Sequence, residues 1–204
     1  MLTPWRRCLY KKIAGLSLEG RVLDLGGSRK SGYHELISGS HEIVVVNLDA
    51  VCGSDESFDL EKPFPIGVGS YDAVLAMNVL EHIFDHRLFL AEAFRVLKSG
   101  GKAVIGVPFF MNVHPSPHDY WRYTEEALSE LLKDAGFKDV KIEPVGSGPF
   151  TASAQLLSIA LPVAPVRVVM ELAARMLDAV LGLFVGKQVL QKRYPLGYYV
   201  QATK

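Results

Sequence analysis

The chain has 204 residues, 49% of them hydrophobic, with 22 basic and 22 acidic residues. That much apolar material can fill the core of one compact domain. A formal net charge of zero removes the simplest argument for a nucleic-acid partner. The two cysteines, Cys8 and Cys52, are too few for a disulfide framework and lack metal-ligand spacing. We therefore expect a cytoplasmic protein, possible contact with a membrane surface aside.

Residues 1–20 predict a short amphipathic helix. The segment is basic but lacks the continuous apolar run of a signal peptide. Trp5, Leu9, Ile13 and Leu16 recur at helical spacing, with basic residues largely on the other side. A helix that packs on the domain and leaves its basic face in solvent is favoured over a membrane-surface or lid helix.

Residues 21–147 alternate between strand and helix patterns and form the predicted cofactor-binding core. The stretch Val22–Ser28, VLDLGGS, predicts a buried strand that ends in an acid and a glycine turn. Further strands are expected at 41–49, 71–77, 102–107 and 137–145. Helices are expected at 87–97, stopped by Gly100 and Gly101, and after Thr124, stopped by Gly136. This order is typical of a parallel sheet with helices on both faces.

Five motifs in this order resemble class I S-adenosylmethionine-dependent methyltransferases. They are the glycine turn, an acid after the second strand, DLEKPFP (59–65), YDAVLAMNVLEH (71–82) and RVLKSGGK (95–102). The resemblance covers roughly residues 21–145. It implies an enzyme that uses S-adenosyl-L-methionine, with S-adenosyl-L-homocysteine as product. It also implies an α/β, Rossmann-like fold with a doubly wound, mostly parallel sheet of seven strands, in one methyltransferase domain over 1–204. The last strand, expected at 194–204, would be antiparallel.

The resemblance also implies a set of cofactor contacts. The loop around the methionine moiety would be formed by Gly26, Gly27 and Ser28 beside Asp24, and the ribose would be held by Asp49, with Asn47 as the competing choice. Adenine would be read by Asp59 and Leu60, and Asn78 would lie where cofactor and substrate meet. Ser28 and Lys30 stand where the family commonly has glycine, and Gly32 could supply the missing freedom. A dinucleotide dehydrogenase is disfavoured because the G-x-G-x-x-G pattern is absent after the first strand.

Substrate chemistry is expected in residues 108–124, which follow a strand and carry many hydrogen-bonding and stacking groups. His118 is the first choice of general base, oriented by Asp119 or another carboxylate, and His114 is the second. Arg122 would bind an anionic or polyol substrate, with substrate contacts also from Tyr120, Trp121 and Tyr123. The alternative is that Asp119, Arg122 and Tyr123 form a network that shapes the loop.

The segment HDYWRYT, residues 118–124, resembles a methyltransferase subgroup found in glycan pathways. The predicted reaction is therefore methyl transfer to a small molecule, with an oxygen of a sugar or glycan-linked intermediate as the first choice. A lipophilic or isoprenoid acceptor is the first alternative. A non-catalytic domain that binds S-adenosylmethionine or a partner is the second.

Two histidine pairs with a spacing of four, His82 with His86 and His114 with His118, do not predict a metal site. Pro115 and Pro117 deny the second pair a helix, and the first pair fits a helix-capping turn with Glu81 and Asp85.

Residues 148–190 predict a hydrophobic helical insert before the last strand. Four charged residues fall on one stripe of its long helix, which argues against a membrane span: Arg167, Glu171, Arg175 and Asp178. The helix therefore has a narrow polar edge and a wide apolar face. Packing of that face on the parent domain is favoured. A homodimer interface, a roof over a lipophilic substrate and membrane-surface contact are the alternatives.

Overall fold

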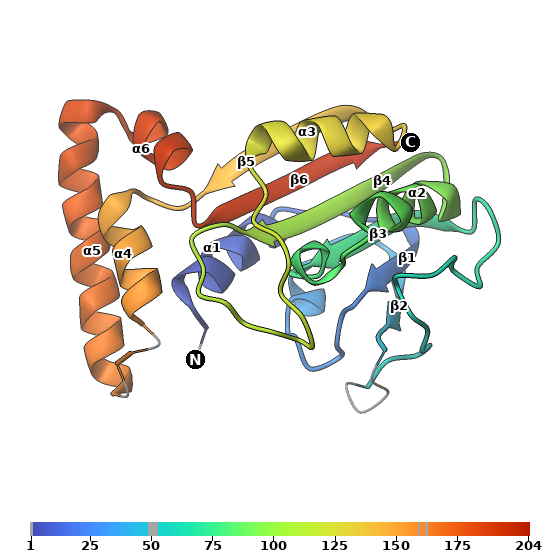
Figure 1. Ribbon diagram of the computed structural model, residues 1–204, viewed down its shortest axis with the longest axis horizontal. Helices are drawn as coiled ribbons and strands as arrows, with labels where there is room; N and C mark the ends of the chain where they lie inside the picture. Colours follow the sequence, from blue (N-terminus) through green and yellow to red (C-terminus); the bar gives the residue numbers. More distant parts are fainter. Residues whose placement is uncertain (1, 49–52, 159, 162) are drawn as a thin grey trace.

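The computed structural model describes residues 2–48, 53–158, 160–161 and 163–204. Its centre is a six-stranded sheet in the order β2-β1-β3-β4-β6-β5 (Figure 1). The strands are β1 (Gly20–Leu25), β2 (His41–Val46), β3 (Tyr71–Met77), β4 (Leu97–Pro108), β5 (Lys138–Val145) and β6 (Gly197–Thr203). The helices are α1 (Pro4–Ile13), α2 (His86–Val96), α3 (Glu125–Asp134), α4 (Pro149–Leu157), α5 (Ala164–Val185) and α6 (Lys187–Arg193). Two 3₁₀ turns bear on the site, η1 (His34–Leu36) and η3 (Leu80–His82).

The strand directions confirm the predicted parallel core and reversed last strand. β1 pairs in parallel with β2 and β3, and β3 with β4, whereas β6 is antiparallel to both β4 and β5. The described part of the chain contributes six strands to the sheet, so the expected count of seven is wrong there. Beside the free edge of β2, a single parallel bridge joins Val46 to Glu56. Hydrogen bonds between residues 45–47 and residues 55–56 hold the chain against this edge, but the described residues form no further strand there.

The predicted boundary between α2 and β4 is also corrected. Leu97 is fully buried and extended, with φ −71° and ψ 142°, so α2 ends one residue earlier and β4 begins there. Gly100 and Gly101 consequently lie inside β4 instead of ending the helix. The register against β3 shifts between Tyr71 and Ala73, and Gly100 adopts a left-handed φ of 76° that suits an irregular stretch.

Helices cover both faces of the sheet. α2 and α3 pack on one face, and α1 lies behind the sheet on the other (Figure 1). Trp5, Leu9 and Ile13 of α1 are no more than 1% exposed, which confirms the predicted packing of this helix on the domain. Burial of each such side chain stabilises the fold by about 1.5–3 kcal/mol. Thr3 caps α1, because its side chain accepts a hydrogen bond from the Arg6 N–H.

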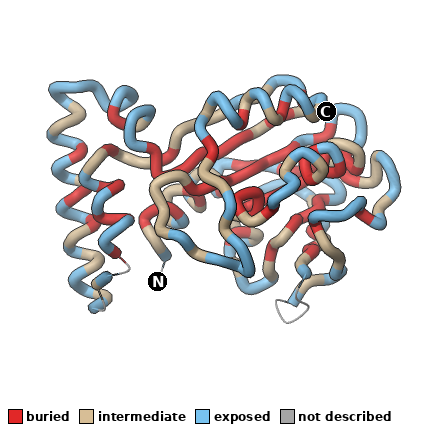
Figure 2. Tube along the Cα trace, in the orientation of Figure 1, coloured by how far each residue is buried: buried red, intermediate tan, exposed pale blue. Residues whose placement is uncertain are grey.

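The long helix α5 faces the opposite way from the favoured expectation. Its polar stripe points inward: Glu171 forms an ion pair with Arg7, and Asp178 accepts hydrogen bonds from the backbone N–H groups of Phe150 and Thr151 at the start of α4. Its apolar face is turned outward (Figure 2), so the expectation that the parent domain covers it is wrong. None of the described helices is both long enough and apolar enough to traverse a bilayer.

Candidate active site

The glycine turn after β1 lies against two neighbouring elements. A Cβ on Gly27 would sit 1.9 Å from Oδ2 of Asp24, and a Cβ on Gly26 would sit 2.6 Å from Cγ2 of Val79. Gly26 also has a left-handed φ of 72°. A larger side chain at either position would therefore displace its neighbour. The turn brings the backbone close to the carboxyl ends of β1 and β3, as the glycine motif predicts.

Asp24 is fully buried at the end of β1. One of its oxygens, Oδ2, accepts hydrogen bonds from the Tyr33 hydroxyl at 2.5 Å and from Nε2 of His34 at 2.6 Å. The other oxygen, Oδ1, is buried and has no hydrogen-bond partner among the described residues. Burial, and then the negative charge of Asp24, raise the pKa of Tyr33 well above its usual range, so Tyr33 remains a donor.

Three strand ends converge on this turn. The side-chain amide nitrogen of Asn47, just after β2, donates to the carbonyl oxygens of Gly26 and Gly27 at 3.2 and 2.9 Å. Asn78, just after β3, has a left-handed φ of 57°, and its Oδ1 accepts a hydrogen bond from Nε1 of Trp5 at 2.5 Å. The structure thus brings the predicted cofactor residues of β1, β2 and β3 to one edge of the sheet. Asp49 lies outside the described residues.

The loop that carries Asp59 and Leu60 is anchored from α2. Oε2 of Glu92 accepts a hydrogen bond from the Phe64 N–H at 2.6 Å, and Arg95 donates to both carboxylate oxygens of Glu92. Arg95 also donates to the carbonyl oxygens of Phe64 and Ile66. Hydrogen bonding to Arg95 lowers the pKa of Glu92 from its usual value, with burial opposing the shift. Within the loop, Leu60 is buried and the Asp59 carboxylate accepts from the Glu61 N–H.

The loop after β4 contains a connected ion pair. Arg122 donates to both oxygens of Asp119, at 2.5 and 2.8 Å, and to backbone carbonyl oxygens of its own loop. Hydrogen bonding to Arg122 is the main reason that the pKa of Asp119 lies far below its usual range. The hydroxyl of buried Tyr123 donates to the Leu80 carbonyl oxygen. This geometry favours the loop-shaping alternative for these three residues, because the guanidinium of Arg122 is engaged within the loop.

The remaining loop candidates differ in exposure. The His118 ring is exposed and lies 5.3 Å, centroid to centroid, from the ring of Tyr120. The Trp121 ring is partly buried, and its Nε1 donates to the Ile83 carbonyl oxygen. The carboxylate of Asp119, which we expected to orient His118, instead accepts from the backbone N–H of His114 and lies 3.3 Å from Nδ1 of that residue. The second-choice histidine therefore occupies the carboxylate-rich position.

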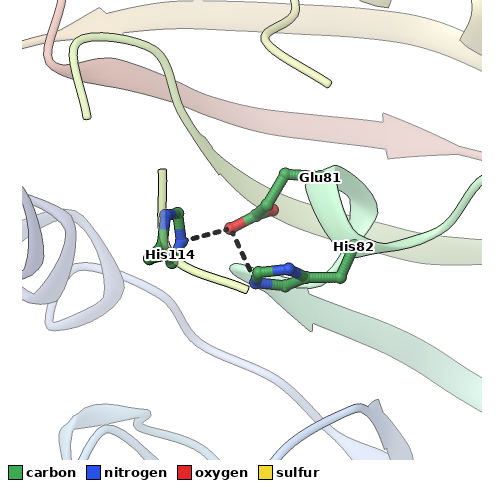
Figure 3. Close-up of side chains that lie close together, drawn as sticks. All are labelled: Glu81, His82 and His114. Carbon is green, nitrogen blue, oxygen red and sulfur yellow. Dashed lines mark ion pairs between the residues drawn. The ribbon is translucent and has the colours of Figure 1, made fainter. Parts of the chain in front are cut away.

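Glu81 connects η3 with the loop after β4. From the sequence we expected only a helix-capping role for it. It is fully buried in η3, and its Oε1 lies 3.7 Å from Nε2 of His82 and 3.8 Å from Nε2 of His114 (Figure 3). The nearby Glu81 carboxylate is the main reason that the pKa of His114 is raised, against the effect of burial. The sequence feature that could have indicated this role is an acidic residue among the apolar residues Leu80 and Ile83, shortly after the predicted strand 71–77.

Residues 5–105, just under half of the chain, match the family model described as a methyltransferase domain. The match spans β1, the glycine turn, β3 and most of β4. Together with the parallel sheet, the reversed last strand and the glycine turn, it supports a class I S-adenosylmethionine-dependent methyltransferase, an enzyme class whose cofactor is S-adenosylmethionine.

Curated relatives are also named as methyltransferases. A protein of Mycobacterium tuberculosis named as a probable S-adenosylmethionine-dependent methyltransferase is 31% identical over 91 residues, which are 42% of this chain and 33% of the relative. The chloroplastic 2-methyl-6-phytyl-1,4-hydroquinone methyltransferase of Arabidopsis thaliana is 35% identical over 88 residues, which are 41% of this chain and 25% of that protein. The chain thus spans a third or less of the length of these relatives.

Solved structures agree with the fold. A SAM-dependent methyltransferase from Archaeoglobus fulgidus superposes with a TM-score of 0.60 at 18% identity, covering 98% of this chain and 94% of that one. Phosphoethanolamine N-methyltransferase 2 of Haemonchus contortus, in complex with S-adenosyl-L-methionine, gives 0.59 at 16% identity, covering all of this chain and 54% of that one. At these identities the similarity concerns the fold alone.

Proposed function

We propose that this chain transfers the methyl group of S-adenosylmethionine to an oxygen atom of a small-molecule acceptor. The observation that carries the proposal is the glycine turn with its buried, half-satisfied carboxylate at Asp24. S-adenosylmethionine carries a cationic amino group and a sulfonium. A carboxylate with one oxygen that has no hydrogen-bond partner among the described residues can bind such a cation. Gly26, Gly27 and Ser28 would approach the methionine part, and Asn47, Asp49, Asp59, Leu60 and Asn78 are the further proposed contacts.

Methyl transfer from a sulfonium is an in-line displacement, so the acceptor must be aligned and a hydroxyl acceptor must lose its proton. The candidates for these roles lie in η3 and in the loop after β4, and both segments begin at carboxyl ends of strands. His114 is supported as the base by its position between Glu81 and Asp119. His118 remains a candidate, because its exposed ring could meet an acceptor that enters from solvent. A sugar or glycan-linked hydroxyl remains the first proposed acceptor.

A lipophilic acceptor is the second candidate, and α5 favours it. The outward residues of this helix are apolar and strongly exposed, including Leu172, Met176, Val180, Leu183 and Phe184, the last two at 83% each. Residues 149–193 contain only two acids, Glu171 and Asp178, both buried. The exposed charges of the described part of this segment, on Lys187, Lys192 and Arg193, are all positive. An apolar face flanked by cations fits an anionic lipid surface.

The apolar helices also border the proposed acceptor loop. The side-chain amide of Asn112 donates to the Leu156 carbonyl oxygen at 3.4 Å, and Nε2 of Gln155 lies 2.9 Å from the sulfur of Met111. The loop that carries His114 therefore borders α4, the helix on which α5 packs. The relatives that act on phytyl hydroquinones are consistent with a lipophilic acceptor.

The first experiment tests methyl transfer and the role of Asp24. Purified protein is incubated with methyl-labelled S-adenosylmethionine and a membrane-containing extract, and label is measured in lipid and aqueous fractions. We expect transfer by the wild type and a loss of at least about tenfold in Asp24→Asn, since a hydrogen bond to a charged group contributes about 1.5–3 kcal/mol. Asp72→Asn, at the amino end of β3 and therefore at the opposite end of the strands from Asp24, is the matched control and should retain transfer.

The fraction that holds the label separates the two acceptor classes. Label in water-soluble sugars supports the first acceptor and removes the second, whereas label in lipid supports the second. Transfer at the same rate in Asp24→Asn and the wild type would contradict the cofactor assignment. An absence of transfer, with no S-adenosylhomocysteine binding, would contradict the enzyme itself.

A flotation assay tests the lipid surface. We expect the wild type to float with vesicles that contain phosphatidylglycerol and to float less with pure phosphatidylcholine, because cations and apolar area act together. Leu183→Glu with Phe184→Glu should abolish flotation, and Lys187→Ala with Lys192→Ala should weaken only the anionic preference. If the protein floats with neither kind of vesicle, and if it forms a dimer that the glutamate variant dissociates, this face is instead an interface between two copies of the chain.

A further inference from the structure

We propose that Glu81, His82 and His114 form a binding site for one divalent transition-metal ion (Figure 3). The site lies at the carboxyl ends of the strands, beside the proposed cofactor site. Glu81 and His82 come from η3, directly after β3, and His114 comes from the loop after β4. This revises the expectation from the sequence, in which neither histidine pair was a ligand pair. The structure takes one histidine from each pair and adds a buried carboxylate.

The three donor atoms are close to coordination geometry. Nε2 of His82 and Nε2 of His114 lie 3.7 and 3.8 Å from the same oxygen of Glu81, and all three donor atoms lie within 4.8 Å of one another. Metal bonds of about 2.1 Å place neighbouring tetrahedral ligands roughly 3.4 Å apart. Bringing the donor atoms to these separations requires them to approach one another by up to about 1.4 Å.

Hydrogen bonds already hold both imidazoles in the orientation that a ligand needs. Nδ1 of His82 lies 2.5 Å from the carbonyl oxygen of His118, and Nδ1 of His114 lies 2.9 Å from that of Asn112. A carbonyl oxygen can only accept, so each Nδ1 carries a proton. In the neutral imidazoles, each Nε2 then presents its lone pair toward Glu81. Metal-binding histidines are commonly oriented by such a bond to the other ring nitrogen.

Glu81 supplies the independent reason for a cation. The residue is fully buried, and neither carboxylate oxygen has a hydrogen-bond partner among the described residues. The two Nε2 atoms, at 3.7 and 3.8 Å, are within ion-pair distance of Glu81 when the imidazoles are protonated, but they are too distant for hydrogen bonds. Buried carboxylates are normally paired, hydrogen-bonded or bound to metal. A metal ion between the three donors would satisfy this group.

The donor set identifies the class of ion. Two imidazole nitrogens and one carboxylate oxygen suit Zn²⁺, Fe²⁺, Co²⁺ or Mn²⁺, whereas Mg²⁺ and Ca²⁺ prefer sites built from oxygen atoms. Three protein ligands leave at least one position open, as in metal sites that act on a bound hydroxyl. The His114 side chain is 30% exposed, so the open side of the cluster is reachable from solvent.

The use of this site rests on the proposed methyl transfer, although metal binding itself does not. With the ion bound, His114 is a ligand and not the base, and an acceptor hydroxyl on the ion would lose its proton to bulk water at the exposed side. A lone pair of the resulting oxygen would form the new O–CH₃ bond while the CH₃–S bond of the sulfonium breaks. The electron pair of that bond stays on sulfur, which leaves neutral S-adenosylhomocysteine sulfur and the methylated acceptor.

Cobalt provides the test, because the visible absorption of Co²⁺ reports its ligands. Protein stripped with a chelator is titrated with Co²⁺, and absorption and thermal melting are recorded. We expect one equivalent to bind, with a visible band and a raised Tm. Glu81→Gln and His114→Ala should each weaken binding by at least about tenfold and remove the band. His118→Ala, in the same loop, is the matched control and should bind Co²⁺ as the wild type does.

Three results would overturn the proposal. They are the absence of binding by the wild type, equal binding by all variants, and a Tm that Co²⁺ raises equally in Glu81→Gln and the wild type. Because His114 is partly exposed, His114→Ala is expected to fold even if Glu81→Gln does not. Titration of the same samples with S-adenosylhomocysteine separates failure of the metal site from failure of the proposed function, since cofactor binding should survive in His114→Ala.

Discussion

Glu92 shows how a single buried side chain away from the glycine turn supports the proposed cofactor site. Its carboxylate is shared between Arg95 and the backbone of Phe64, so the residue ties the loop after Asp59 to α2. Without it, the Phe64 N–H would lose its acceptor, and the Arg95 guanidinium would keep only the carbonyl oxygens of Phe64 and Ile66. Leaving such groups unpaired costs about 1–3 kcal/mol each.

Glu92→Gln should lower the free energy of unfolding by about 1.5–3 kcal/mol at neutral pH. The folded pKa of Glu92 is depressed below the unfolded value of 4.5, mainly by Arg95. Its stabilising contribution is therefore complete above pH 4.5 and is lost as the pH falls through the folded pKa. Denaturant titrations at pH 7 and at pH 3.5 measure the difference in the free energy of unfolding between wild type and variant. This difference should be smaller at pH 3.5, and an equal difference at both pH values would show that the charge of Glu92 plays no part.

The residue least visible in the sequence is Glu81. Its chain position after β3 could be predicted, but its partner His114 is 33 positions away in an irregular loop. Loop composition identified residues 108–124 as important without indicating which groups meet. The pairing of Asp119 with Arg122 is local, at a spacing of three, and the sequence analysis included it as an alternative. Contacts within one loop are therefore more predictable than contacts between two loops.

At the scale of elements, α1 is coupled to the end of β3. The hydrogen bond from Trp5 to Asn78 joins the core-facing side of the helix to a residue in a left-handed conformation, which asparagine tolerates better than most residues. Asn78 is also one of the proposed cofactor contacts. Loss of the Trp5 donor would therefore affect both the packing of α1 and the proposed cofactor edge.

Trp5→Phe should lower the free energy of unfolding by about 1–3 kcal/mol and weaken S-adenosylhomocysteine binding by about two- to tenfold. Leu9→Ala, on the same helix, should destabilise more, by about 2–5 kcal/mol, through cavity formation. Leu9→Ala should nevertheless weaken S-adenosylhomocysteine binding less than Trp5→Phe, because the apolar Leu9 side chain cannot form a hydrogen bond with Asn78. Chemical denaturation and calorimetric titration measure the two effects. If both variants lost affinity in proportion to stability, the specific role of Trp5 would be refuted.

Helix and strand patterns predicted most elements because they depend on local periodicity and caps. β3 lies at the expected residues, and Thr124 and Asp85 cap α3 and α2. The start of β4 was missed because Leu97 satisfies both the helical repeat and a buried strand position. The orientation of α5 was missed for a different reason. Periodicity identifies a polar and an apolar face, but only tertiary partners such as Arg7 decide which face points inward.

At the scale of the whole molecule, the loop after β4 lies between a polar edge of the sheet and α4, on which α5 packs. The carboxyl ends of β1, β2 and β3 meet at a polar edge with Asp24 and Glu81, and the α4–α5 helices present an apolar outer face. Asn112 and Gln155 connect the helices to the loop. Under the second acceptor proposal, the soluble cofactor and a poorly soluble acceptor would approach this loop from different sides.

Calorimetric titration of S-adenosylhomocysteine into the wild type, Gly27→Ala and Gly15→Ala tests the central claim, a cofactor site at the glycine turn. We predict one-site binding by the wild type and a loss of at least about tenfold in Gly27→Ala, whose added Cβ would collide with Asp24. Gly15→Ala, whose added Cβ would lie 3.5 Å from the Lys12 carbonyl oxygen, should bind nearly as the wild type does. No heat from the wild type, or equal affinity in Gly27→Ala, would contradict the account.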